Sequence, residues 1–92
     1  MHTLSAKLTF YIPQATSLKD KRQIRRSLVD KTRQRFNASV AEVATQDVHQ
    51  TLTLSVAVVS GDLGCAQRLL DEIVRFMEEH AECSLFRNDR CT

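Results

Sequence analysis

The sequence predicts an α+β domain in which two helices cover one face of a four-stranded antiparallel sheet. Three observations predict it: two segments alternate between apolar and polar residues, two others carry apolar residues at helical spacing, and the elements follow the order βαββαβ. At 92 residues the chain has room for a single domain, residues 1–92, with one core. Its apolar fraction of 42% and charged fraction of 26% are typical of a globular domain and exclude a disordered chain.

The first third of the chain is predicted to hold a strand and a helix. Thr3–Ile12 alternates as a strand with one buried face does, and a proline follows it. Ser17 and Asp20 form a variant of the capping box, in which the hydroxyl bonds a free N–H and the carboxylate lies at the positive helix end. The helix is predicted to run to about Phe36, because Asn37 tolerates the left-handed conformation that ends many helices.

The rest of the chain repeats this pattern. Ala38–Ala44 is predicted to be a strand although a glutamate interrupts it, and polar residues 45–50 connect it to an alternating strand, Thr51–Val59. A Ser-Gly-Asp turn then begins a helix over Asp62–His80, and Cys83–Arg90 forms a short last strand. In this order both helices cover one sheet face and the polar face stays open, which is the ferredoxin-like arrangement.

Positive charge is concentrated in the first predicted helix. Lys19–Arg35 holds eight basic and two acidic residues, a net charge of +6, whereas the remaining five basic and nine acidic residues give −4. Within this helix, a stripe about 20 Å long is formed by four residues within about 60° of one another on a helical wheel: Lys19, Arg22, Arg26 and Arg33.

This stripe predicts an anionic partner, and RNA or a ribosomal subunit is the first candidate. The candidate nucleic-acid-binding residues are Lys19, Lys21, Arg22, Arg26 and Arg33. The alternative is a solvated helix face whose long side chains cover apolar surface.

Two further arginines of this helix are interpreted as structural. Arg25 falls where an apolar residue would fit better, so it either extends past the sheet edge or meets an acid such as Glu42. Arg35 lies near the helix end, where the negative end of the helix dipole favours a cation.

The open sheet face bears on both candidate functions. A typical RNA-recognition sheet stacks bases on aromatic side chains, and here only Tyr11 could do so. RNA binding would therefore use the basic helix and the phosphate backbone, without strong sequence readout. The small polar side chains of this face also suit packing on a second copy, so the alternative function is a protein-interaction or structural homodimer that binds no nucleic acid.

The sequence carries no recognisable catalytic or metal-binding motif. Residues 13–17 lack both the Gly and Arg of an acylphosphatase phosphate cradle and the paired cysteines of a metal-transfer domain. The histidines fall in different elements: His2, His49 and His80. We therefore expect no enzymatic activity, no metal, no cofactor and no small-molecule substrate.

The cysteines indicate the compartment. The spacing of Cys65, Cys83 and Cys91 matches no zinc site, and we expect free, reduced thiols. Cys83 and Cys91 could pair only if the last strand folds back or two chains meet. With neither a secretory leader nor a membrane-spanning segment in this sequence, we expect a cytoplasmic protein with no membrane partner.

Several stretches resemble the YlxP-like family of small bacterial proteins, a domain family of unknown function. Ser17–Arg22 resembles its S-L-K-x-K-R opening of the first helix, and Arg35–Val43 is close to its R-F-N-x-S-V-A-E-V passage. Gln46–Gln50 follows a D-x-W-Q pattern and Val58–Asp62 a V-S-N-D pattern. These motifs follow one another in the family's order, from Ser17 to Asp62.

The resemblance implies a ferredoxin-like fold, no known catalysis, and an association with RNA, the ribosome and translation. The basic residues that match the family motifs are Lys19, Lys21, Arg22 and Arg35. Two departures stand out: His49 occupies the place of a Trp that could stack or pack, and Gly61 replaces an Asn in a turn.

Overall fold

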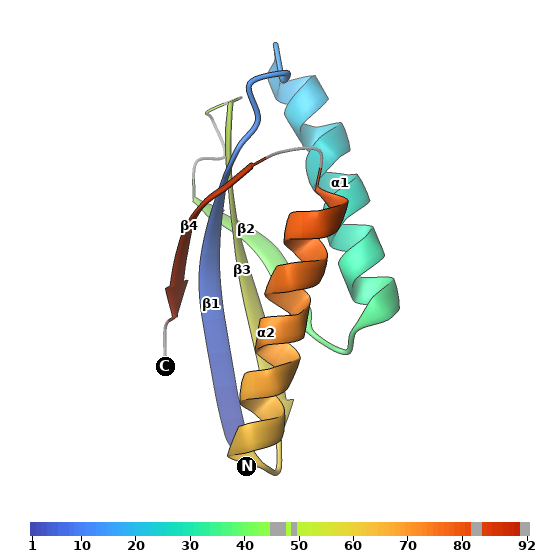
Figure 1. The fold of residues 1–92 in the computed structure, drawn as a ribbon. Helices are drawn as coiled ribbons and strands as arrows, with labels where there is room; N and C mark the ends of the chain where they lie inside the picture. The colour runs from blue at the N-terminus through green and yellow to red at the C-terminus, as the bar shows by residue number, and fades with distance from the viewer. Residues whose placement is uncertain (45–47, 49, 82–83, 91–92) are drawn as a thin grey trace.

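The computed structural model has a four-stranded antiparallel sheet with two helices on one face (Figure 1). The elements are β1 (His2–Tyr11), α1 (Leu18–Arg35), β2 (Ser39–Ala44), β3 (Thr51–Ser60), α2 (Leu63–His80) and β4 (Ser84–Arg90). The structure describes residues 1–44, 48, 50–81 and 84–90. The predicted ferredoxin-like βαββαβ arrangement is confirmed.

The strands lie in the order β2-β3-β1-β4, so β1 and β3 are central and β2 and β4 are the edges. β1 and β3 pair without interruption, from His2 opposite Ser60 to Tyr11 opposite Thr51. The β2–β3 register shifts between Glu42 and Ala44, which marks an irregularity near the end of this edge strand. α2 packs on β1 and β3, whereas α1 packs on β2 and against α2. One side of α1 therefore faces the exposed edge of the sheet.

The core lies between the sheet and the helices, as the alternation predicts. Buried side chains come from both central strands and from α2: Ala6, Leu8, Phe10, Leu52, Leu54, Val56, Val58, Leu70, Ile73 and Met77. Cys65, in the first turn of α2, is a free thiol and is exposed. It directly precedes the buried Ala66, and consecutive helical residues point about 100° apart, so its side chain falls off the buried face.

The predicted cap of α1 is confirmed. The Ser17 hydroxyl accepts a hydrogen bond from the Asp20 N–H at 3.2 Å. The Asp20 carboxylate in turn accepts from the Thr16 N–H at 3.0 Å and from the Thr16 hydroxyl at 2.7 Å. The predicted stop at Asn37 is one residue late, because Phe36 is already extended and closes the helix through its N–H to the Thr32 carbonyl.

The other boundaries differ from expectation by one residue. β1 ends at Tyr11, and Ile12 stays buried while its N–H donates to the Gln50 carbonyl at 2.9 Å. Asp62 caps α2 from outside, with its carboxylate accepting from the Cys65 N–H at 3.1 Å. Most of the predicted 45–50 connection, including His49, lies outside the described residues, as do Cys83 and Cys91. Neither α1 nor α2, the helices within the described residues, is long and apolar enough to cross a membrane.

Candidate nucleic-acid interface

The basic residues of α1 divide into two groups, one holding the helix on the sheet and one exposed. This division follows from the position of α1 beside the edge strand β2. Side chains that point toward β2 find an acceptor there, and those on the outer side meet solvent. The two groups therefore have different chemistry.

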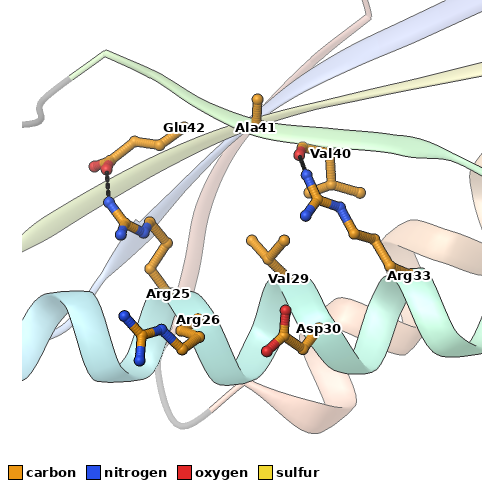
Figure 2. Close-up of a pocket in the computed structure, with 8 residues that line it drawn as sticks. All are labelled: Arg25, Arg26, Val29, Asp30, Arg33, Val40, Ala41 and Glu42. Carbon is orange, nitrogen blue, oxygen red and sulfur yellow. Dashed lines mark hydrogen bonds and ion pairs between the residues drawn. The ribbon is translucent and has the colours of Figure 1, made fainter.

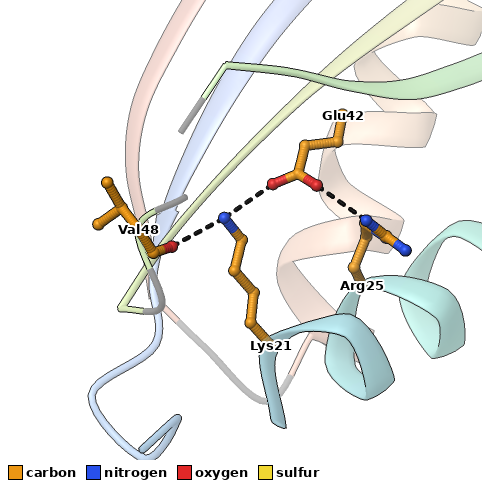
Figure 3. A network of polar contacts seen from close by, with 4 residues as sticks. All are labelled: Lys21, Arg25, Glu42 and Val48. Atoms are coloured by element: carbon orange, nitrogen blue, oxygen red, sulfur yellow. Dashed lines mark hydrogen bonds and ion pairs between the residues drawn. The ribbon is translucent and has the colours of Figure 1, made fainter. Parts of the chain in front are cut away.

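Lys21 points inward, toward β2. Its side chain is 2% exposed, and its ammonium lies 2.8 Å from a carboxylate oxygen of Glu42 and donates to the Val48 carbonyl at 2.8 Å (Figure 3). The prediction that Lys21 belongs to the binding surface is therefore wrong. Lys21 precedes the buried Leu28 by seven residues, nearly two helical turns, so both lie on the same buried side.

Arg25 shares the same carboxylate, which confirms the suggested pairing with Glu42. Its guanidinium donates to the second Glu42 oxygen at 2.9 Å, and its side chain is 33% exposed where that of Glu42 is 6% exposed. The glutamate that interrupts β2 in the sequence thus holds two cations from α1. Because these charges serve the fold, neither Lys21 nor Arg25 contributes a full positive charge to the surface.

Arg33 lies in the last turn of α1 and bonds the edge strand directly. One nitrogen of its guanidinium donates to the Val40 backbone carbonyl at 2.7 Å (Figure 2). The residue remains exposed, and a guanidinium has five N–H donors, so others are left for a ligand. Arg33 is therefore both a structural and a candidate binding residue.

Between α1 and β2 lies an open depression of about 390 Å³ (Figure 2). Three arginines of α1 line it, together with two carboxylates and three apolar residues: Arg25, Arg26, Arg33, Asp30, Glu42, Val29, Val40 and Ala41. Since Glu42 is already paired, Asp30 is the acid that opposes Arg26 and Arg33 there. The depression is basic overall.

Three predicted binding residues are exposed and uncommitted. Lys19, Arg22 and Arg26 make no hydrogen bond or ion pair with any residue that the structure describes. They extend along α1 from its first turn to the depression beside β2. Two of them are arginines, which can contact a phosphate through two N–H groups at once.

The first turn of α1 also fixes a negative charge beside Lys19. Hydrogen bonds from the Thr16 hydroxyl and N–H lower the pKa of Asp20 below its ordinary value of 3.8, and the nearby Lys19 charge lowers the pKa further. Asp20 is therefore ionised at neutral pH and weakens the field of Lys19. Arg22 and Arg26 lie farther along the helix and carry the stronger part of the surface.

Arg35 lies against an aromatic cluster. Arg35, interpreted as structural, lies 6.0 Å from the ring centroid of Phe36 and 5.9 Å from that of Phe76. The aromatic cluster under it was missed, although Phe76 and His80 are spaced i, i+4 on a helix and so share one face. Among the described residues, no three His, Cys, Asp or Glu side chains gather as a metal site would require.

Comparison with known proteins identifies the family of this chain. The uncharacterized protein YlxP of Bacillus subtilis (strain 168) is 28% identical over 71 residues, 77% of this chain and 77% of that protein. The sequence profile of a family described as "Protein of unknown function (DUF503)" matches residues 3–90, almost the whole chain. This chain belongs to that family, DUF503.

Proposed function

We propose that the protein is a non-enzymatic RNA-binding module that associates with the ribosome through the exposed side of α1. The observation that carries the proposal is the row of uncommitted cations, Lys19, Arg22 and Arg26, beside the partly engaged Arg33. An exposed helix without a charged partner usually mixes both signs along its surface. Glu42 neutralises the inward charge, and among the described residues Asp30 and the capping Asp20 are the acids beside the outward charge.

The chemistry of these side chains suits a phosphate backbone. Phosphate contacts from Arg and Lys set affinity and orientation without reading the base sequence. Four contacts on single-stranded RNA correspond to a slope of about −3 in log affinity against log salt. Affinity should then fall roughly 50-fold between 50 and 200 mM salt, which is a measurable signature.

The test is co-sedimentation of the purified protein with ribosomal subunits over a salt series. Wild-type protein should bind at low salt and be released steeply as salt rises. The double variant Arg22→Glu with Arg26→Glu should not bind, because the row then repels phosphate. Absence of wild-type binding at low salt, or undiminished binding of the variant, would overturn the proposal.

A matched control variant changes the net charge by the same amount at a different place on the surface. Lys7→Glu with Arg68→Glu also changes the net charge by four units, on β1 and α2, where both residues are exposed. This variant should bind nearly as well as wild type. Equal loss of binding in both double variants would show that total charge, and not the α1 surface, causes retention.

A second candidate function rests on the sheet face that no helix covers. Two exposed apolar side chains lie on it by strand alternation, Tyr11 and Val59, among small residues such as Ser55 and Ala57. A second copy of the chain could pack there around a two-fold axis. Sedimentation equilibrium that gives a dimer for wild type and a monomer for Ala57→Glu would favour this function. A wild-type monomer at all concentrations would exclude it.

A further inference from the structure

In the part of the chain that the structure describes, aromatic rings gather at the carboxyl ends of α1 and α2. Phe36 and Phe76 meet edge to face, with ring centroids 5.3 Å apart and planes at 81°. His80 stacks on Phe76, with centroids 4.0 Å apart and planes at 21°. Phe36 follows α1, whereas Phe76 and His80 belong to the last turns of α2, so the cluster joins the two helices.

The His80 ring is held in a fixed orientation. Its Nδ1 lies 2.9 Å from the Phe76 carbonyl oxygen. A carbonyl only accepts, so Nδ1 carries the hydrogen, and Nε2 is the ring nitrogen left for another group. Phe76 covers one face of the imidazole, and the residue is exposed. The stack therefore ends in a positioned aromatic ring that faces solvent.

The space beside this ring suits a base better than a phosphate. A depression of about 410 Å³ adjoins the cluster, a volume typical of small-ligand sites. Its charged lining residues are Arg35, Arg75, Glu72 and Glu79, whose charges cancel. A neutral depression with aromatic walls does not attract phosphate, but carboxylates and guanidinium groups can hydrogen-bond the polar edge of a base.

Cations flank the platform on the α1 side. Arg35 lies over the Phe36 and Phe76 rings, and Lys31 lines a smaller depression of about 190 Å³ that also includes His80. Both belong to α1, on the side of the helix toward α2, whereas Arg33 points to β2. A nucleic-acid strand that crosses the end of α1 would pass from the basic depression at β2 to this cluster.

We propose that His80, supported by Phe76 and Phe36, is a stacking platform for one unpaired base of single-stranded RNA. Lys31 contacts the phosphate next to that base, and Arg35 hydrogen-bonds the polar edge of the base. This inference rests on the proposed function and adds the ligand class, because a base within a duplex cannot reach the ring without unpairing.

The test compares a labelled single strand of about 12 nucleotides, within the usual range of site sizes, with the same strand in a duplex. Binding is measured by fluorescence anisotropy at low salt. His80→Ala should weaken binding of the single strand by about 5- to 150-fold, the range found when an aromatic stacking partner is removed. Duplex binding should not change.

Three variants separate stacking from loss of folding. His80→Phe keeps a ring and should retain single-strand binding, and Gln67→Ala, on the exposed side of the same helix, should behave as wild type. Circular dichroism would show that each variant is folded. Arg22→Glu with Arg26→Glu should abolish binding of both probes, as the proposed function requires.

The outcomes distinguish the two proposals. If the double arginine variant loses binding but His80→Ala does not, the platform is overturned and the proposed function stands. If His80→Ala weakens both probes equally, or His80→Phe fails to retain binding, stacking is overturned. If wild type binds neither probe, both proposals are overturned.

Discussion

The pairing of Glu42 with one lysine and one arginine leads to a quantitative prediction about stability. Glu42→Gln removes the charge that compensates Lys21, whose side chain is 2% exposed, while preserving the size of the side chain. Breaking a buried pair by removing one partner costs about 3–5 kcal/mol, because the other charge stays buried without compensation. For a domain of this size, that corresponds to a fall in melting temperature of roughly 12–40 °C.

Arg25→Gln is the matched variant, since it removes the other cation from the same carboxylate. Arg25 is 33% exposed and Lys21 still compensates Glu42, so the loss should not exceed about 1 kcal/mol, as for a surface pair. Replacing both buried partners, Lys21→Met with Glu42→Gln, should cost less than the sum of the single changes, because no buried charge remains uncompensated.

Urea denaturation followed by circular dichroism measures the free energy of unfolding of all four proteins. If Glu42→Gln and Arg25→Gln lower this free energy equally and by less than about 1 kcal/mol, Lys21 is hydrated and is not a buried charge. The double variant also tests the assignment of Lys21 to the fold. It should sediment with ribosomal subunits as wild type does if the folded protein binds them.

Three further predictions concern the caps and the core. The Asp20 carboxyl, which accepts hydrogen bonds from Thr16, should show a pKa below 3.8 in an NMR pH series. Because folding lowers this pKa, the ionised carboxylate stabilises the folded protein at pH values above the unfolded-state pKa, and this stabilisation is lost as pH falls through the folded-state pKa. Thr16→Val should raise that pKa toward 3.8, and an unchanged value would contradict the assigned cause. Asp62→Ala should cost about 1 kcal/mol in urea denaturation through loss of the α2 cap, and no loss would mean that water replaces it. Leu54→Ala, at a fully buried position in β3, should cost about 2–5 kcal/mol, and a smaller loss would show that the core collapses around the gap.

Alternation and helical spacing were sufficient to predict the fold from the sequence. Strands β1 and β3 bury one face each, so their period-two pattern is unambiguous, and the caps at Ser17 and Asp62 use side chains whose preference is strong. The register shift near Glu42 could not be predicted, because it depends on how β2 meets β3 and α1 together. No local pattern encodes such an arrangement.

The site was predicted less well, for a physical reason. Charged residues are seldom buried, so a lysine in a basic run is assigned to the surface by default. Lys21 departs from that default because its ammonium reaches the carboxylate of Glu42, which lies far along the chain on the edge strand β2. The wheel alone already places Lys21 near Leu28, and weighing that angle above the charge would have predicted that Lys21 is buried, though not its partner.

The bond from Arg33 to the Val40 carbonyl has a consequence for solubility. An edge strand with open backbone groups is a template on which another chain can add a strand, and charged side chains laid across it discourage such aggregation. Arg33 occupies one of those groups on β2 and places a cation there. Arg33→Ala would therefore expose an edge strand that can self-associate, even if the isolated fold remained stable. Aggregation would then confound any loss of ligand binding in this variant. Substitutions of Arg22 and Arg26 do not expose the edge strand and report on binding alone.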